Sequence, residues 1–438
     1  MNSPKDSSPD RRTFLKSSSA VAVGGAVASQ VAFPSVTLGK PTDKKLKVGL
    51  IGCGGRGTGA ATQALKADSN IELTAMADAF SEKLERSLQI IGKTKGVESV
   101  KVKVKDSHKF TGLDGYKKVL DSGVDVVILT TPPGFRPAHL VEAVQADKHV
   151  FTEKPMATDV PGVRLVQKAV DISKQKNLAM VAGFCWRYDY ARKELFKRIH
   201  DGQIGDVRSC YGTYLTGPVK PMPPADTRPE GLSDLEWQVR NWYNFNWLSG
   251  DGLVEQAIHT VDWVGWLMGD QAPTSCTAVG GRQIPAHGGN IYDHVEVNYV
   301  WENHVRGTVA QRQISGCHNE NSFYVSGSEG EGWIKGGRVY ITGKNPWRYR
   351  GPKNNMYQTE HDEMFASIRE GNVNNDGDRM INSTLMGIMG RTAGYTGKEI
   401  TWEQISNAKQ QIAPQDLLNW KDQIKAEPMA LPGRTKFV

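Results

Sequence analysis

A glycine-rich hexapeptide, Gly52-Cys53-Gly54-Gly55-Arg56-Gly57, follows a short apolar run at residues 46–51 and precedes a helical pattern. Its spacing, G-x-G-x-x-G, binds the pyrophosphate of a dinucleotide where it lies between a strand and a helix. The phosphates approach the backbone too closely for side chains, and the helix N-terminus offers free N–H groups and a positive dipole. We therefore assign Gly52, Gly54, Gly55, Arg56 and Gly57 to cofactor binding.

A carboxylate follows the next apolar run. Asp78 comes directly after residues 71–77 and lies 21 residues after Gly57. At this distance a carboxylate can accept hydrogen bonds from the adenosine ribose hydroxyls and repel a 2′-phosphate. The sequence therefore predicts NAD as the cofactor. Arg56 is a nearby cation that could weaken this preference, so NADP stays possible.

Glu255 and His259 are four residues apart in a segment whose apolar residues recur with helical spacing, so both are expected on one helix face. An imidazole that titrates near neutrality suits removal of a proton from an alcohol while the carbon loses hydride. The adjacent carboxylate can orient the imidazole or grip the substrate. Asp262, one turn further on, could fix the imidazole tautomer or cap a neighbouring segment. A surface histidine paired with glutamate is the alternative.

These residues must be positioned by strands and helices that alternate along residues 41–185, a pattern typical of a parallel, doubly wound sheet. The expected strands are 46–51, 71–77, 125–130, 149–152 and 179–183, and the expected helices between and after them include 116–120, 137–146 and 160–176. Residues 186–438 begin with a helix at 191–201 and continue with strand patterns. We expect an α+β domain there with a largely antiparallel open sheet, whose final helices, 360–370 and 382–395, pack back across both domains.

Ligands of a parallel sheet bind at the carboxyl ends of its strands. Thr131 and Pro132 follow one expected strand, and Glu153 and Lys154 follow another, so we assign all four to the cofactor site. The Lys154 ammonium would lie at the nicotinamide end, where it can hydrogen-bond a substrate hydroxyl and stabilise negative charge as the proton leaves. A solvated lysine in a turn before Pro155 is the alternative.

Taken together, these motifs resemble the Gfo/Idh/MocA family of nicotinamide-dependent oxidoreductases over nearly all of the chain after its first forty residues. The resemblance is carried by the glycine loop, Thr131-Pro132-Pro133 with His139, Glu153-Lys154-Pro155, 184–187, 202–205, 250–262, 391–393 and 401–402. It implies that Lys154 is catalytic and that its bond to Pro155 is cis. Relatives of inositol dehydrogenase carry D-x-x-x-H, where this chain has Glu255 and His259. The resemblance also implies a homo-oligomer that uses the free face of the second sheet.

Further residues of the second domain are expected near substrate by the same resemblance. Arg187, Tyr188 and Asp262 are assigned to substrate contact. Four tryptophans crowd the segment before and around the helix at 253–262 and suit either a sugar site or a core: Trp186, Trp237, Trp242 and Trp247.

The function implied is transfer of hydride between a sugar, polyol or glycoside hydroxyl and NAD, with His259 as base and Lys154 and Glu255 assisting. The alternative is redox-neutral glycoside hydrolysis through transient oxidation of the sugar. The Tyr-Pro-Thr-His element of relatives with that activity is replaced here by Gln256-Ala257-Ile258-His259. A protein that binds cofactor or ligand without catalysis is a lesser alternative, because both Lys154 and His259 are present.

The first forty residues have the features of a targeting signal. Arg11-Arg12-Thr13-Phe14-Leu15-Lys16 precedes a charge-free, weakly apolar run at residues 17–39, which resembles a twin-arginine export signal. Ala26-Val27-Ala28 offers a cleavage site. We expect the folded protein, carrying its cofactor, to be exported to the periplasm by the twin-arginine machinery; an uncleaved membrane anchor and a basic tail are the alternatives.

The composition of the chain excludes several other classes of protein. The chain has 438 residues, 39% of them hydrophobic, which is enough for two or three globular domains. Its net charge of +7 is mild, and the basic stretch at 93–105 contains no aromatic residue, so we expect a solvated loop there and no nucleic-acid partner. Five scattered cysteines without C-x-x-C predict free buried thiols, with neither a metal site nor a disulfide framework.

Overall fold

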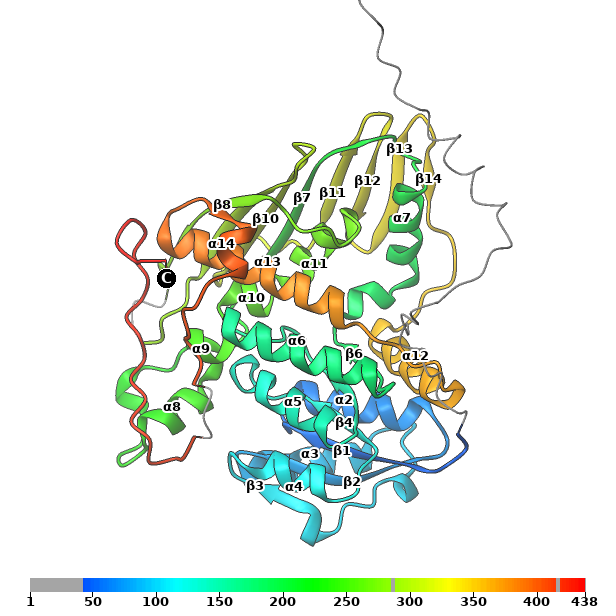
Figure 1. Cartoon of the computed structure of the whole chain (residues 1–438), viewed down its shortest axis with the longest axis vertical. Helices are drawn as coiled ribbons and strands as arrows, with labels where there is room; N and C mark the ends of the chain where they lie inside the picture. Colours follow the sequence, from blue (N-terminus) through cyan, green and yellow to red (C-terminus); the bar gives the residue numbers. More distant parts are fainter. Residues whose placement is uncertain (1–41, 285–287, 415–417, 438) are drawn as a thin grey trace, which may run out of the picture. The chain divides into compact units, whose positions relative to one another are not determined.

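A computed structural model describes residues 42–284, 288–414 and 418–437 (Figure 1). The expected export signal lies outside these residues. No helix in the described part of the chain combines the length and apolarity needed to cross a bilayer.

The first sheet consists of six parallel strands among the described residues, which confirms the predicted parallel sheet; five match the expected strands, and the short strand Lys109–Thr111 at its edge was not expected. In spatial order they are β3 (Lys109–Thr111), β2 (Ile71–Asp78), β1 (Leu46–Ile51), β4 (Val126–Leu129), β5 (His149–Thr152) and β6 (Met180–Ala182). Every residue of β4 is buried, because helices cover both faces of a doubly wound sheet. The order reverses between β1 and β4, which is where such sheets bind ligands.

Helices and short 3₁₀ turns connect these strands. The helices are α2 (Gly55–Ala67), α3 (Ser81–Lys93), α4 (Gly115–Asp121), α5 (Arg136–Gln145) and α6 (Val160–Gln175), and the turns are η1 (Ser99–Lys101), η2 (Asp106–His108), η3 (Pro133–Phe135) and η4 (Cys185–Tyr188). The basic stretch at 93–105 is not simply solvated. Lys101 is buried, and its Nζ donates to the carbonyls of Leu65 and Asp68 at the end of α2, where a cation is favourable.

The second sheet has nine described strands and is mostly antiparallel, which confirms the predicted fold class. In order they are β14 (Trp347–Arg348), β13 (Arg338–Gly343), β12 (Gly330–Lys335), β11 (Phe323–Gly327), β7 (Val207–Thr216), β10 (Arg306–Gln313), β9 (His294–Val300), β8 (Ser275–Gly281) and β15 (Ile400–Thr401). Only β7 and β10 pair in parallel among these strands. Residues of β9 alternate between buried and more exposed, so one sheet face is packed.

Further helices pack on this sheet or connect the two sheets (Figure 1). They are α7 (Tyr190–His200), α8 (Asp234–Arg240), α9 (Asn246–Ser249), α10 (Gly252–Glu255), α11 (Ile258–Leu267), α12 (Met356–Glu370), α13 (Gly377–Thr396) and α14 (Trp402–Ser406), with turns η5 (Ala225–Thr227) and η6 (Trp242–Asn244). Helix α12 contacts α2, and α13 contacts α6 as well as β8 and β9. Helix α12 begins earlier than expected because the Asn355 side chain caps it by accepting from the N–H of Tyr357.

The five cysteines are all free, and four of them are buried. Cys317 is exposed, contrary to the expectation of buried thiols, because it lies in the polar connection between β10 and β11.

His361 of α12 is fully buried against the first sheet, and its ring lies on that of Phe151 with centroids 4.2 Å apart. Neither ring nitrogen has a hydrogen-bond partner among the described residues. Burial, and then the charge of Arg56, lowers the pKa of His361 well below its ordinary value. The folded state therefore holds this imidazole neutral at pH values where the unfolded chain protonates it.

We predict that the free energy of unfolding falls as pH drops below about 6.5, because only the unfolded state then binds this proton. His361→Phe should reduce that pH dependence by up to about 1.4 kcal/mol per pH unit. Urea unfolding at a series of pH values from 7.5 to about 5 measures it. His318→Phe, at an exposed position, is the matched control and should keep the wild-type slope; an unchanged slope in His361→Phe would contradict the prediction.

Candidate functional site

A cavity of about 580 Å³ lies at the carboxyl ends of the parallel strands. Residues that follow β1, β2, β4, β5 and β6 line it, and so do residues of β7, α10 and α11 from the second domain. Of the residues predicted for the site, Gly52, Gly54, Gly55, Arg56, Gly57, Asp78, Thr131, Pro132, Glu153, Lys154, Glu255 and His259 all line this cavity. The fold thus brings together residues separated by about two hundred positions in the chain.

The glycine loop is shaped both for its own packing and for a ligand. Gly52 has φ +96°, and a Cβ on Gly57 would lie 2.0 Å from the Gly52 carbonyl oxygen, so both positions need glycine for the turn and the strand–helix contact. A Cβ on Gly54 or Gly55 would meet no described protein atom within 4 Å. These two glycines therefore leave open space in front of the N-terminus of α2, where a pyrophosphate fits.

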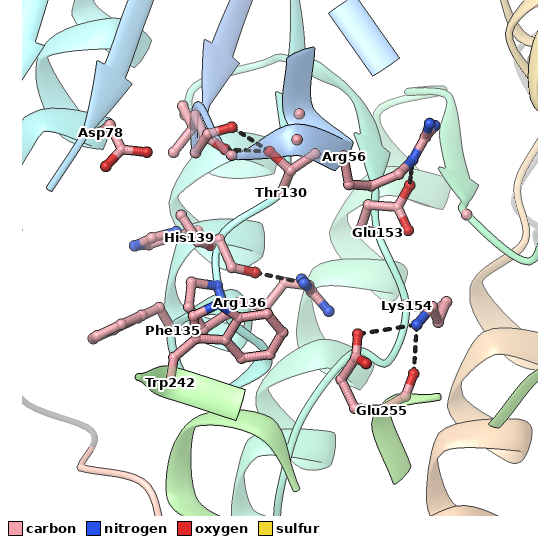
Figure 2. A pocket seen from close by; sticks show the side chains of 18 of the residues that line it. Arg56, Asp78, Thr130, Phe135, Arg136, His139, Glu153, Lys154, Trp242 and Glu255 are labelled. Atoms are coloured by element: carbon pink, nitrogen blue, oxygen red, sulfur yellow. Dashed lines mark hydrogen bonds and ion pairs between the residues drawn. The ribbon is translucent and has the colours of Figure 1, made fainter. Parts of the chain in front are cut away.

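Asp78 lies at the end of β2, in the part of the cavity farther from Lys154 (Figure 2). Its carboxylate accepts hydrogen bonds from the backbone N–H of Cys53, at 2.7 Å, and of Phe80, at 3.0 Å. Burial raises the pKa of this carboxyl. The carboxylate is held beside the glycine loop, where a ribose diol fits and a 2′-phosphate would be repelled.

Arg56 does not pair with Asp78 in the described structure. Its Nε donates to Glu153 Oε1 at 2.5 Å, and its Nη2 donates to Gln63 and Glu360. Figure 2 shows the guanidinium turned toward Glu153, with Asp78 across the cavity. The structure therefore shows no contact through which Arg56 could offset the charge of Asp78 and weaken the preference for NAD. Sequence reasoning missed Glu360, a buried carboxylate from α12 whose pKa burial raises well above its ordinary value.

Lys154 and Glu255 form a buried ion pair between the two domains. Lys154 Nζ donates to Glu255 Oε1 at 3.0 Å and also to the Glu255 backbone carbonyl (Figure 2). The Lys154–Pro155 peptide is cis, as the resemblance implied. Gln256 Nε2 donates to Glu255 Oε2 at 2.6 Å, and the Tyr214 hydroxyl donates to Gln256 Oε1 at 2.6 Å. Each Glu255 oxygen thus accepts one described donor, and the carboxylate holds Lys154 in place.

The expected continuous helix through Glu255 and His259 is wrong. Glu255 is the last residue of α10, and His259 lies in α11, after a break at Gln256 and Ala257. The physical reason is that Lys154 takes the Glu255 carbonyl, while the His259 N–H turns to the Gln256 carbonyl at 3.4 Å. Both side chains still face the cavity.

His259 is held by aromatic packing. Its ring lies 4.9 Å from that of Trp186, at an interplanar angle of 31°, and its buried Nδ1 has no hydrogen-bond partner among the described residues. Burial, and then the charge of Lys154, lowers the pKa of His259 well below its ordinary value. The sequence predicts an imidazole that titrates near neutrality, and the structure differs because the ring is buried. The imidazole is neutral at pH 7 and has a lone pair to accept a proton.

Three residues expected near substrate lie in buried ion pairs and hydrogen bonds away from the cavity lining. Arg187 donates to both oxygens of Asp262, at 2.9–3.0 Å, and also pairs with Asp270. The Tyr188 hydroxyl donates to Asp376 at 3.1 Å. Asp262 also accepts from Ser383 Oγ at 2.7 Å and makes no described bond to His259, so it does not set the imidazole tautomer. None of the three lines the cavity in the described structure, so their contact with substrate stays a prediction.

The remaining predicted residues divide between site and core. The Thr131 hydroxyl lies 3.2 Å from Nδ1 of His139, whose pKa burial lowers to about 3. Trp186 and Trp242 line the cavity, whereas Trp237 and Trp247 pack in a separate cluster around Phe80. Tyr214 and Gln256 were missed because no spacing in the sequence links β7 to the loop before α11. Within the described residues no group of three or more His, Cys, Asp and Glu side chains is placed to hold a metal ion.

Comparison with known proteins identifies both parts of the chain. Residues 46–184 match a family model described as an oxidoreductase family with an NAD-binding Rossmann fold. Residues 193–331 match one described as the GFO/IDH/MocA C-terminal domain.

Individual relatives are distant. An uncharacterized oxidoreductase of Streptococcus pneumoniae is 29% identical over 182 residues, 41% of this chain and 44% of that protein. An inositol 2-dehydrogenase of Salmonella typhimurium is 24% identical over 230 residues, 52% of this chain and 56% of that protein. The matches thus span about half the length of these curated relatives. A levoglucosan dehydrogenase solved with NADH and levoglucosan shares the fold, with a TM-score of 0.64 and 19% identity over 81% of this chain and 99% of that one.

We predict that the protein binds NADH more tightly than NADPH, and that Asp78→Ser reduces this preference about tenfold by removing the charge that faces a 2′-phosphate. Titration of both dinucleotides, followed by quenching of tryptophan fluorescence, measures the ratio. Glu82→Gln, which removes a nearby carboxylate that pairs with Arg240 instead, should keep the wild-type ratio. A preference that survives in Asp78→Ser would show that another group selects the cofactor.

Proposed function

Because this chain belongs to the Gfo/Idh/MocA family of oxidoreductases, we propose that it transfers hydride between a hydroxyl-bearing carbon of a sugar, polyol or glycoside and NAD. The observation that carries the proposal is a single cavity with two chemically different ends. One end has the open glycine loop and Asp78, and the other has Lys154, Glu255 and His259. Bound there, NAD would supply the hydride acceptor.

Lys154 serves as the donor to the substrate oxygen. Its ammonium is held by the Glu255 carboxylate at 3.0 Å and by the Glu255 carbonyl, so it can present its remaining N–H to an oxygen at this end of the cavity. A cation at this position stabilises the negative charge that develops on the oxygen as its proton leaves. Because both groups are buried, water screens this interaction only weakly.

His259 serves as the proton acceptor. Burial keeps its imidazole neutral. Packing against Trp186 orients the ring, a task that a carboxylate hydrogen-bonded to the other ring nitrogen performs in many sites. Transfer of the hydroxyl proton to this ring leaves an alkoxide beside Lys154, and loss of hydride from the carbon is then favoured.

The wall of this end of the cavity supports a carbohydrate substrate. Trp186 and Tyr214 contribute aromatic surface beside His259, which suits the apolar face of a sugar ring, while Glu255 and Gln256 contribute polar groups for hydroxyls. The names of the relatives point the same way, since an inositol dehydrogenase and a levoglucosan dehydrogenase act on compounds of this class.

Nicotinamide absorbance tests the proposal directly, with purified protein, NAD and a panel of free sugars, polyols and aryl glycosides. We expect absorbance to rise with at least one member, and Lys154→Met to abolish turnover while NADH still binds. Lys174→Met, at a surface ion pair, is the control and should keep full activity. Aglycone release without a rise in absorbance would indicate glycoside hydrolysis, and full turnover by Lys154→Met would remove the lysine from the mechanism.

We further propose that the protein is exported by the twin-arginine machinery, on the strength of Arg11-Arg12 and the charge-free run that follows. Replacement of both arginines by lysine should retain the protein in the cytoplasm, as cell fractionation would reveal. An unchanged periplasmic fraction in that variant would contradict export by this route.

A further inference from the structure

The substrate end of the cavity contains a buried guanidinium that forms no direct ion pair with a described carboxylate. Arg136, the first residue of α5, lines the cavity and is 3% exposed, and no described acidic oxygen lies within ion-pair distance of it. A buried charge is costly unless it is paired, so a buried cation without a direct ion pair in a cavity is a notable feature of this site.

The contacts of Arg136 use only part of its hydrogen-bonding capacity. Nη2 donates to the Thr131 carbonyl at 2.5 Å, Nη1 donates to the Pro155 carbonyl, and Nε is buried without a partner among the described residues. A guanidinium has five N–H donors. Neutral side chains could serve two carbonyls equally well, so these contacts alone give no reason for a positive charge.

The nearby carboxylates are already engaged. Glu153 pairs with Arg56, and Glu255 accepts from Lys154 and Gln256. Of the three cations Arg56, Lys154 and Arg136, only Arg136 has no direct carboxylate partner among the described residues (Figure 2). The phosphates of a bound dinucleotide would lie elsewhere, against the glycine loop and the N-terminus of α2.

We infer that Arg136 selects substrates that carry a carboxylate, so that the sugar taken by this site is a sugar acid such as a hexuronate or an aldonate. The inference rests on the proposed function for the location of the substrate. A substrate carboxylate that accepts the remaining N–H groups of Nη1 and Nη2 would give the guanidinium a direct charge partner. It would also leave Lys154 and His259 free for the hydroxyl that reacts.

The experiment compares matched pairs on NADH-loaded protein: glucuronate with glucose, galacturonate with galactose, and gluconate with sorbitol. Isothermal titration calorimetry measures each dissociation constant. In at least one pair we expect the acid to bind about tenfold more tightly than its neutral partner, as suits a hydrogen bond between charged groups. No preference for the acid in any pair, including no binding at all, would overturn the inference.

Two variants assign the preference to this residue. Arg136→Gln keeps donors for the two carbonyls and should lose the preference, whereas Arg136→Lys keeps the charge and should retain part of it. Lys83→Gln removes a cation that lines the same cavity beside Asp78 and should leave the ratio unchanged. A preference that persists in Arg136→Gln would contradict the assignment; if that variant does not fold, the wild-type pairs and Arg136→Lys decide.

Turnover is scored separately from binding, so the two proposals can fail independently. Preferential binding of an acid, with no reduction of NAD by any compound of the panel, would overturn the proposed function and leave the role of Arg136 standing. Reduction of NAD by neutral sugars, with no preferential binding of the matching acids, would overturn the role of Arg136 and leave the proposed function standing.

Discussion

The buried ion pair between Lys154 and Glu255 joins the two domains at the site. Lys154 follows β5 of the parallel sheet, and Glu255 ends α10 of the second domain, 101 residues further along the chain. Both side chains are almost fully buried, so removing either partner would leave an uncompensated charge, at a typical cost of about 3–5 kcal/mol. This contact fixes the Lys154 ammonium beside the loop that leads to His259.

Neighbouring features follow from that pair. The Glu255 carbonyl turns to Lys154, which interrupts the helix and places His259 at the start of a second helix. Gln256 and Tyr214 extend the hydrogen bonds from the Glu255 carboxylate to β7 of the second sheet. One ammonium thus organises groups from both sheets, and burial lowers the pKa of His259 so that its imidazole is neutral.

Local patterns in the sequence predict the parallel sheet, the glycine loop and Asp78, because each depends on neighbouring residues. They also place Lys154 at the end of a strand, whereas its catalytic role is implied by the family resemblance. The break before His259 and the pairing of Arg187 with Asp262 could not be predicted in this way. Both arise from partners 75 to 101 residues apart, whose contacts leave no periodic signal. Arg136 was missed for a different reason: the sequence gives no sign that a lysine or arginine will be buried without a direct carboxylate partner.

A double-mutant cycle on Lys154 and Glu255 tests the central claim most directly. The rate of hydride transfer to NAD is measured under single-turnover conditions for the wild type, Lys154→Met, Glu255→Gln and the double variant. If the carboxylate acts by holding the ammonium, the two losses are strongly non-additive, and the double variant is little worse than Lys154→Met alone. Additive losses would show that the two side chains act independently and would contradict the account.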